Sequence, residues 1–234
     1  MRDYTGEPIG EALLTTLIEA AQGASSSNFI QAYSLIQVNR PEARARIAKA
    51  AGGQRWIERA AVFLICCADL RRIDQACRAH DRGQLDGWAE HSLAAVIDGA
   101  LLGQNLLLAA ESVGLGGLFI GGIRNDPQVV VDELVLPELV LPMFGLCLGW
   151  PSEQAREQAV KPRMPVDLIL HQDRYHDPEP DAIGAYDATM AAYYRERGSN
   201  ARLDDWSAAT ANGVQGKKRK HMFDFMRERG FFKR

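Results

Sequence analysis

The feature that most constrains this chain is a long apolar segment at its centre. Residues 85–113 follow the pattern of one helix, and apolar side chains go most of the way around it. The large ones are Leu93, Val96, Ile97, Leu101, Leu107 and Leu108. A helix that is hydrophobic on all sides must be buried on all sides, and a chain of 234 residues can achieve this by sharing it with a second copy. The segment therefore predicts a symmetric homodimer.

Predicted helices and strands alternate along the rest of the chain. One helix lies between Pro8 and Gly23, and another begins at Pro41, because the first turn of a helix tolerates proline. Further helices are expected at residues 126–134, 181–195 and 217–227, and strands at residues 33–38, 60–68, 115–123 and 140–148. This order indicates an α+β or α/β fold with a mixed sheet.

Charge and composition exclude several classes of protein. A formal net charge of -3 does not favour nucleic acid or an anionic membrane surface as a partner. The central apolar segment contains Asp98, Gln104 and Asn105, and such residues are costly inside a membrane, so no membrane span is expected. The first residues do not form an apolar signal segment, and we expect a cytoplasmic protein.

Cysteine, histidine and serine patterns give no catalytic or metal signature. The four cysteines are best explained as buried free thiols in a reducing compartment. The five histidines lack metal-ligand spacing, and no G-x-S-x-G nucleophile motif occurs. We therefore expect no metal site and no catalytic side-chain nucleophile.

Three segments are compatible with a ligand site and equally with ordinary structure. Residues 114–122 are rich in glycine, which allows close approach by a ligand but also suits a β-bulge. Their spacing does not match G-x-G-x-x-G, so a Rossmann dehydrogenase is not expected. Lys161-Pro162-Arg163 places two cations on a fixed backbone, as a phosphate site requires, although exposed basic residues are commoner. The basic run at residues 217–220 fits a solvated helix face equally well.

Short segments that are ambiguous alone form a specific combination in this order. They are RDYTGEPI at residues 2–9, ASSSNFIQ at 24–31, GGQ at 52–54, ESVGLGG at 111–117, IGGIRN at 120–125, FGLCLGWP at 144–151, KPR at 161–163 and RGSN at 197–200. The set resembles the oxygen-insensitive NADPH nitroreductases and the related NADPH–flavin reductases, over nearly the whole chain. The resemblance implies an α+β nitroreductase fold with a mixed central sheet flanked by helices. It also implies an intertwined homodimer with FMN sites built from both subunits.

The resemblance assigns flavin-binding roles to residues at matching positions. Arg2 corresponds to the basic residue beside the N1–C2=O edge of the flavin. Ser26 corresponds to a residue of the serine segment that helps to hold FMN, and Gln54 to a glutamine that hydrogen-bonds the pyrimidine ring. The strand that passes the isoalloxazine is matched by Phe119, Ile120, Gly121 and Gly122.

It also implies where the phosphate groups of the cofactors bind. Lys161 and Arg163 match the pair that binds the FMN phosphate. The basic residues that the family uses for NADPH and its 2′-phosphate are matched by Arg197, Arg202 and Arg219.

These roles suggest a division of the chain. Residues 1–165 would form the FMN-binding core. Residues 166–234 would form an extension that wraps the partner subunit and contributes to the NADPH site.

The activity implied is two-electron transfer from NADPH through FMN to nitroaromatics or quinones, with ping-pong kinetics. The flavin carries the chemistry, and Arg2 supports its reduced form electrostatically. A flavin reductase that supplies free reduced FMN is the second hypothesis. A degenerate, non-catalytic flavin-binding protein is the third, because the His-Arg-Ser-like segment that the family places just before Arg2 does not precede it here, and a weaker FMN phosphate site is expected.

Overall fold

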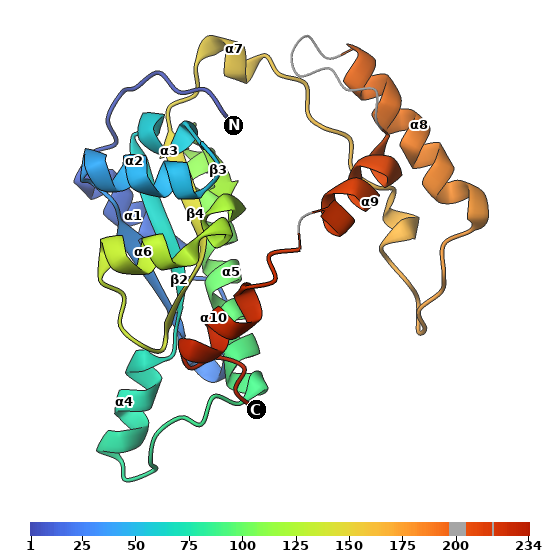
Figure 1. Cartoon of the computed structure of the whole chain (residues 1–234). Coiled ribbons are helices and arrows are strands. Elements are labelled where there is room, and N and C mark those ends of the chain that lie inside the picture. The colour runs from blue at the N-terminus through green and yellow to red at the C-terminus, as the bar shows by residue number, and fades with distance from the viewer. Residues whose placement is uncertain (197–204, 217) are drawn as a thin grey trace. The chain divides into compact units, whose positions relative to one another are not determined.

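The computed structural model describes residues 1–196, 205–216 and 218–234, which form two compact units (Figure 1). The first unit comprises Met1–Arg156 and Arg219–Arg234, and the second unit comprises Glu157–Lys218. The functional division that we expect between residues 165 and 166 stays a prediction.

The first unit contains a four-stranded sheet and most of the helices. Its strands are β1 (Tyr33–Gln37), β2 (Val62–Asp69), β3 (Gly116–Ile120) and β4 (Val140–Gly149). Its helices are α1 (Glu11–Ala21), α2 (Pro41–Ala50), α3 (Trp56–Arg59), α4 (Arg71–Ala79), α5 (Ala89–Ser112), α6 (Pro127–Leu134), α7 (Glu153–Arg156) and α10 (Met222–Glu228). Two short 3-10 helices, η1 (Ser27–Phe29) and η2 (Gly121–Asn125), complete it.

The sheet has the strand order β1-β2-β4-β3, and each neighbouring pair in it is antiparallel. The prediction of a mixed sheet is therefore wrong for the part of the chain that the structure describes. Strands β2 and β3 do run in the same direction, and α5 connects them as it would in a parallel unit. However, β4 lies between them and runs the opposite way, so the two parallel strands never pair.

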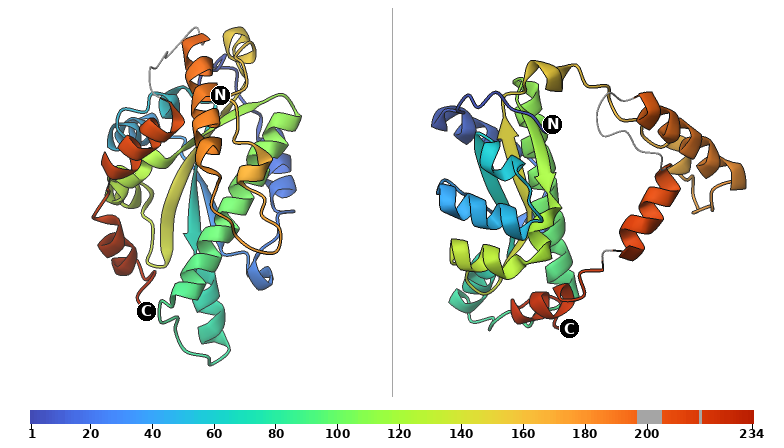
Figure 2. Two further views of the ribbon diagram at one scale, coloured as in Figure 1. Left: turned by 90° about the vertical axis from the view of Figure 1, so that its right-hand side faces the viewer. Right: turned by 45° about the horizontal axis from the view of Figure 1, so that its top comes forward.

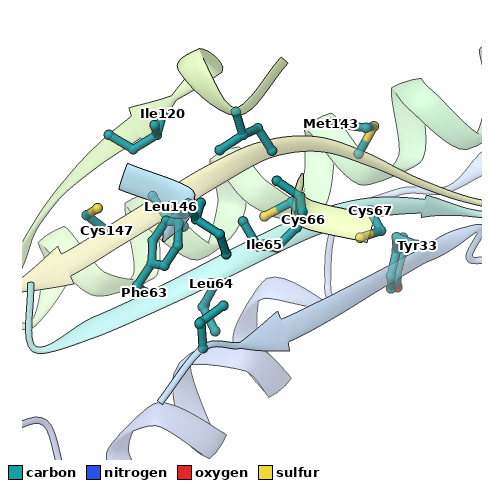
Figure 3. Packing of buried hydrophobic residues seen from close by; sticks show 14 of the residues in the cluster. Tyr33, Phe63, Leu64, Ile65, Cys66, Cys67, Ile120, Met143, Leu146 and Cys147 are labelled. Carbon is teal, nitrogen blue, oxygen red and sulfur yellow. The ribbon is translucent and has the colours of Figure 1, made fainter. Parts of the chain in front are cut away.

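The core lies on both faces of the two central strands. All eight residues of β2 are buried, as expected for a continuous apolar run. Phe63 and Ile65 of β2 and Leu146 of β4 belong to this core, and the cluster is seen from close by in Figure 3. Helix α5 covers one face of the sheet, and α2 and α6 cover the other (Figure 2). This layering fits an α+β fold.

Helix α5 lies very close to the sheet. A Cβ atom added to Gly103 would be 2.8 Å from Cζ of Phe144 in β4, so a side chain at this position would force the Phe144 ring to move. By length and composition α5 could cross a membrane, but this is weak evidence, because core helices pass the same test.

One face of α5 is left exposed by the other described residues of the first unit. Leu93, Ile97, Leu101 and Leu108 are each about half exposed, with exposed fractions of 45–53%. The prediction of a helix buried on all sides therefore does not hold for a single copy. The exposed apolar face is what a helix shared with another copy would present.

Two predicted helices begin later than expected, for reasons that lie elsewhere in the chain. Helix α5 begins at Ala89, because the backbone before it pairs with the C-terminal residues: Lys233 N donates to Gly87 O at 2.7 Å. Helix α10 begins at Met222 because Arg219 adopts a left-handed φ of 31°, which a helix does not allow. Helices α3, α4, α7 and α9 were not predicted.

The cysteines are free, as predicted. Cys66, Cys67 and Cys147 are buried in β2 and β4, and Cys77 is half-buried in α4. Burial raises the pKa of Cys66 and of Cys147 to about 12. These two thiols therefore stay protonated at neutral pH and have little reactivity.

The second unit contains η3 (Val166–Leu168), α8 (Pro180–Glu196) and α9 (Trp206–Gly216). Tyr186, Met190 and Tyr194 of α8 form its small core, and Trp206 of α9 packs against it. Asp187 accepts hydrogen bonds from the Ser207 hydroxyl and backbone N–H. The hydroxyl bond is the main cause of a lowered pKa of Asp187.

Candidate functional site

The segment after β3 meets the end of α2 at a junction where Gly122 lies against Ala51, three residues before Gln54. The strand ends at Ile120, and Gly121 and Gly122 turn into η2 instead of continuing the strand to residue 123 as predicted. Gly122 packs directly on the carbonyl of Ala51, so no side chain fits there. Gln54 lies in the turn after α2, where its N–H donates to Ala48 O at 3.1 Å.

The side chain of Gln54 is half-buried and makes no hydrogen bond within the described residues. Its amide is therefore available to a ligand. Because Gly121 carries no side chain and its Cβ position faces only the end of the Arg124 side chain, a flat ring could approach the backbone there. The pyrimidine contact that the sequence analysis assigns to Gln54 stays a prediction.

Phe119 lies one residue before this junction. It is 36% exposed, and its ring packs edge-on against Phe144 with centroids 5.2 Å apart. Ile120, in contrast, is buried in the core. Of this predicted flavin-passing segment, Phe119 thus offers an exposed side chain, and Ile120 offers only its backbone.

Two arginines, Arg124 and Arg219, lie near each other at the C-terminal end of η2. Arg219 donates from Nε to Asn125 Oδ1 at 3.0 Å, and Arg124 donates to the carbonyl of Met143 at 2.5 Å. Burial lowers the pKa of Arg124, and the positive charge of Arg219 lowers it further. Both arginines are half-buried, and neither forms an ion pair with a carboxylate in the described residues.

Arg2 is held near the other end of β3. The Met1 amino group donates to Gly117 O at 3.0 Å, and Thr5 N donates to Trp150 O at 2.9 Å, so the residues around Arg2 follow the edge of the sheet. Gly117 precedes Gly121 by four residues, or roughly 13 Å of strand. The guanidinium of Arg2 is exposed and has no ion pair among the described residues.

Ser26 is in the loop before β1, at the opposite edge of the sheet. Its Oγ is buried and has no hydrogen-bond partner in the described part of the chain. The loop is attached to α5 by backbone hydrogen bonds from Ser27 and Ala32 to the buried Asp98. An orphaned hydroxyl of this kind is costly unless a ligand or water satisfies it.

A single chain does not bring Ser26 to the glycine junction. Strands β1 and β3 are the two edges of the sheet, three strand spacings apart, or about 14 Å at ~4.8 Å per spacing. A site that used both Ser26 and Gln54 on one small ligand would therefore require a second copy.

In the second unit, Lys161 and Arg163 flank Pro162, whose backbone is anchored by Tyr186. The Tyr186 hydroxyl donates to Pro162 O at 3.1 Å, and the Lys161 ammonium lies 5.5 Å from the centre of the Tyr194 ring. Both cations are exposed, and neither pairs with a carboxylate within the described residues. Both cations are therefore available to a ligand, and the predicted phosphate-binding fork that they form stays a prediction.

Two of the predicted site residues are not among the residues that the structure describes. Two further residues near the candidate site were not predicted from the sequence. Arg197 and Arg202 lie outside the described residues. Sequence reasoning missed Arg124, although it stands in the IGGIRN segment, and it used Asp98 only to exclude a membrane helix. The signal for Asp98 was a lone carboxylate in an apolar helix, which is functional or hydrogen-bonded when buried.

Comparisons with known proteins match the whole chain. The Nitroreductase family matches residues 1–150, and the C-terminal domain of the Nitroreductase family matches residues 161–234. The oxygen-insensitive NADPH nitroreductase of Salmonella typhimurium is 40% identical, with 99% of this chain and 93% of that protein covered. The NADPH-flavin oxidoreductase of Vibrio harveyi is 38% identical, with 100% and 95% covered.

Comparisons with solved structures point to the same family. A nitroreductase from B. subtilis has a TM-score of 0.93 at 35% identity, covering 100% of this chain and 96% of its own. The NADPH:FMN oxidoreductase of Vibrio harveyi, complexed with NAD+, has a TM-score of 0.88 at 37% identity, covering 100% and 95%. The predicted fold is thereby confirmed.

The junction can be tested with two neighbouring glycines. In Gly122→Ala the new methyl group would overlap the Ala51 carbonyl, so we expect a loss of about 1–3 kcal/mol in the free energy of unfolding. In Gly121→Ala it would meet only the end of the Arg124 side chain, at 3.2 Å, and the loss should be much smaller. Urea unfolding of both variants measures the difference. Equal losses would contradict the packing described here.

Proposed function

The chain belongs to the nitroreductase family, and from this premise we propose that it is an FMN-dependent oxidoreductase that takes electrons from NADPH. The single observation that carries the proposal is the fork of Lys161 and Arg163. These cations are unpaired in the described residues and stand on a backbone that Tyr186 anchors. A phosphate would satisfy both.

The remaining groups fit the other parts of FMN. Gln54, three residues after the Ala51 against which Gly122 lies, has a free amide, as a pyrimidine edge requires. Ser26 has a buried hydroxyl without a partner. Arg2 supplies a permanent, exposed cation for the ring edge where negative charge develops on reduction. Bound FMN would supply the chemistry, accepting a hydride from NADPH and passing two electrons to the acceptor.

The nicotinamide cofactor is proposed to meet the cations near η2. Arg219 lies beside Arg124, without a carboxylate partner in the described residues, and both can bind a phosphate of NADPH. Arg197 and Arg202 are proposed for the same cofactor on the basis of the sequence alone. The donor then leaves before the acceptor enters, which gives ping-pong kinetics.

Two classes of acceptor are supported by relatives. The Salmonella typhimurium relative is named an oxygen-insensitive NADPH nitroreductase, and a Bacillus subtilis relative at 37% identity is named FMN reductase (NADPH). We propose nitroaromatics and quinones as the acceptors, with free FMN as the alternative. The hypothesis of a non-catalytic flavin-binding protein finds no support among these relatives.

We propose a homodimer as the working form. Ser26 and Gln54 lie at opposite edges of one sheet, so a second copy is needed to bring them to one flavin. The exposed apolar face of α5 offers the surface for that copy. Within such a dimer, residues 166–234 are proposed to wrap the partner, and we place the protein in the cytoplasm, where NADPH is available.

Steady-state kinetics test the proposed function. The FMN-loaded protein is expected to oxidise NADPH with menadione, with a nitrofuran or with excess FMN, and to give parallel double-reciprocal lines. The acceptor with the highest kcat/KM decides between nitro or quinone reductase and flavin reductase. Absence of NADPH oxidation with every acceptor would refute the proposal.

The phosphate fork is tested by Arg163→Ala. Loss of a hydrogen bond to a charged group should weaken FMN binding about 10- to 100-fold, which corresponds to about 1.5–3 kcal/mol. Titration of the apoprotein with FMN measures the dissociation constant. The control is Arg174→Ala, an exposed arginine of the same unit, which should leave FMN binding unchanged. An unchanged dissociation constant in Arg163→Ala would argue against its assignment.

The dimer is tested by placing a charge on the exposed face of α5. Ile97→Glu should shift the protein to monomers that bind FMN poorly, because a buried, unpaired carboxylate opposes association. Val135→Glu changes a residue that is 85% exposed outside this face and should leave the dimer intact. Sedimentation velocity with and without FMN gives the oligomeric state. A wild-type protein that is monomeric and still retains FMN would contradict the proposed homodimer.

A further inference from the structure

A single buried carboxylate closes the loop that follows Ser26. Asp98 Oδ1 accepts a hydrogen bond from Ser27 N at 2.8 Å, and Oδ2 accepts one from Ala32 N at 3.2 Å. These donors stand at the two ends of the segment 27–32, so one side chain holds both ends. Asp98 is 1% exposed and has no ion pair in the described parts of the chain, so both oxygens are committed to the loop.

The loop needs such a clamp because its backbone is strained. Asn28, Phe29 and Gln31 have φ values of 46°, 58° and 52°, in the left-handed region that residues other than glycine rarely adopt. Strained residues of this kind persist only where their surroundings fix them. Phe29 is 79% exposed, so packing of its own side chain does not hold it. The two hydrogen bonds to Asp98 hold the ends instead.

The clamp also fixes the loop relative to the exposed face of α5. Asp98 follows Ile97, and Leu101 is less than one turn further along the same helix. Both apolar residues belong to the face that a second copy would cover. A loop attached at Asp98 therefore has a defined position with respect to that copy.

We propose that Asp98 is a positioning residue for the flavin site: it preorganises the loop at residues 26–32 so that Ser26 meets FMN. The inference rests on the proposed function, because it takes FMN as the ligand of Ser26. Asp98 itself does not touch the flavin. It removes the cost of ordering a strained loop when the cofactor binds.

The same helix offers a matched control. Asn105 lies two helical turns beyond Asp98, on the same side of α5, and its amide donates to Ala20 O and Ala21 O, each at 3.1 Å. It therefore clamps the end of α1 in the way that Asp98 clamps the loop. Asn105→Ala removes a backbone clamp of α5 without touching the segment 27–32.

The decisive variant is Asp98→Asn, which keeps the shape of the side chain but leaves one acceptor oxygen and turns an NH₂ group toward a backbone N–H. FMN titration of the apoprotein, followed by quenching of flavin fluorescence, should show at least about tenfold weaker binding. The FMN dissociation constant of Asn105→Ala should stay within about twofold of the wild-type value, even if its thermal midpoint falls as much as that of Asp98→Asn. Equal weakening in both variants would overturn the inference.

A double-mutant cycle with Ser26→Ala separates positioning from general stability. If Asp98 acts through the Ser26 loop, Asp98→Asn should weaken FMN binding far less in the Ser26→Ala background than in the wild type. The effect of Asn105→Ala should be the same in both backgrounds. Additive effects of Asp98→Asn and Ser26→Ala would count against a positioning role.

Amide hydrogen exchange gives a readout that does not depend on a variant that folds. In the wild type the Ser27 and Ala32 amides should exchange far more slowly than exposed amides, and FMN should slow them further. Fast exchange at both positions overturns the inference, whatever the state of Asp98→Asn. A wild type that shows slow exchange but binds no FMN refutes the proposed function instead, so the two failures are distinguishable.

Discussion

The close packing of α5 on the sheet is the contact on which the rest of the structure depends. Gly103 allows the helix to lie directly against Phe144, and the helix then covers one face of the sheet from β1 to β3. Because this contact fixes one side of α5 against the sheet, the helical period determines where its other sides face. One carries the polar clamps Asp98 and Asn105, and another presents Ile97 and its apolar neighbours to solvent. One helix thus sets the core, the N-terminal segment and the surface offered to a second copy.

The polar residues of α5 show how far a sequence pattern can be followed. Asp98 and Asn105 are seven residues apart, so their common side of the helix is predictable from the helical period. Their partners are not, because Ser27 and Ala20 lie 71 and 85 residues away in the chain. Backbone groups carry no sequence signature, and a clamp on them cannot be recognised before the fold is known. The sequence therefore identified a carboxylate whose burial is unfavourable, but it did not reveal which backbone groups bind that carboxylate.

Local signals predicted the elements well where one strong cause acted. The continuous apolar run of β2 and the proline that opens α2 are confirmed at nearly their predicted bounds. The mixed sheet was wrong because pairing depends on the insertion of β4 between β2 and β3, and no short-range pattern records it. Helix α9, rich in small and polar residues, has no strong apolar period and was missed for that reason.

The candidate site was predicted as a set of positions, and the structure adds which of them can act together. Gly122 lies against Ala51, three residues before Gln54, because η2 packs on the end of α2. Ser26 lies at the other edge of the sheet, which motif order alone does not disclose. Motifs that resemble a family identify residues, whereas the strand order determines that one copy does not unite them.

This separation has a thermodynamic consequence for the proposed enzyme. The groups assigned to FMN are unsatisfied in the chain alone: Ser26 Oγ is buried without a partner, and Lys161 and Arg163 have no carboxylate among the described residues. In the proposed homodimer, a cofactor that satisfied groups from both copies would bind the assembled state and not the separated copies. Its binding then stabilises the assembly, by about 2.7 kcal/mol at a concentration 100 times its dissociation constant. In the proposed dimer, cofactor loading and dimerisation would therefore be one linked equilibrium, and the loop held by Asp98 would make the assembled state less costly to order.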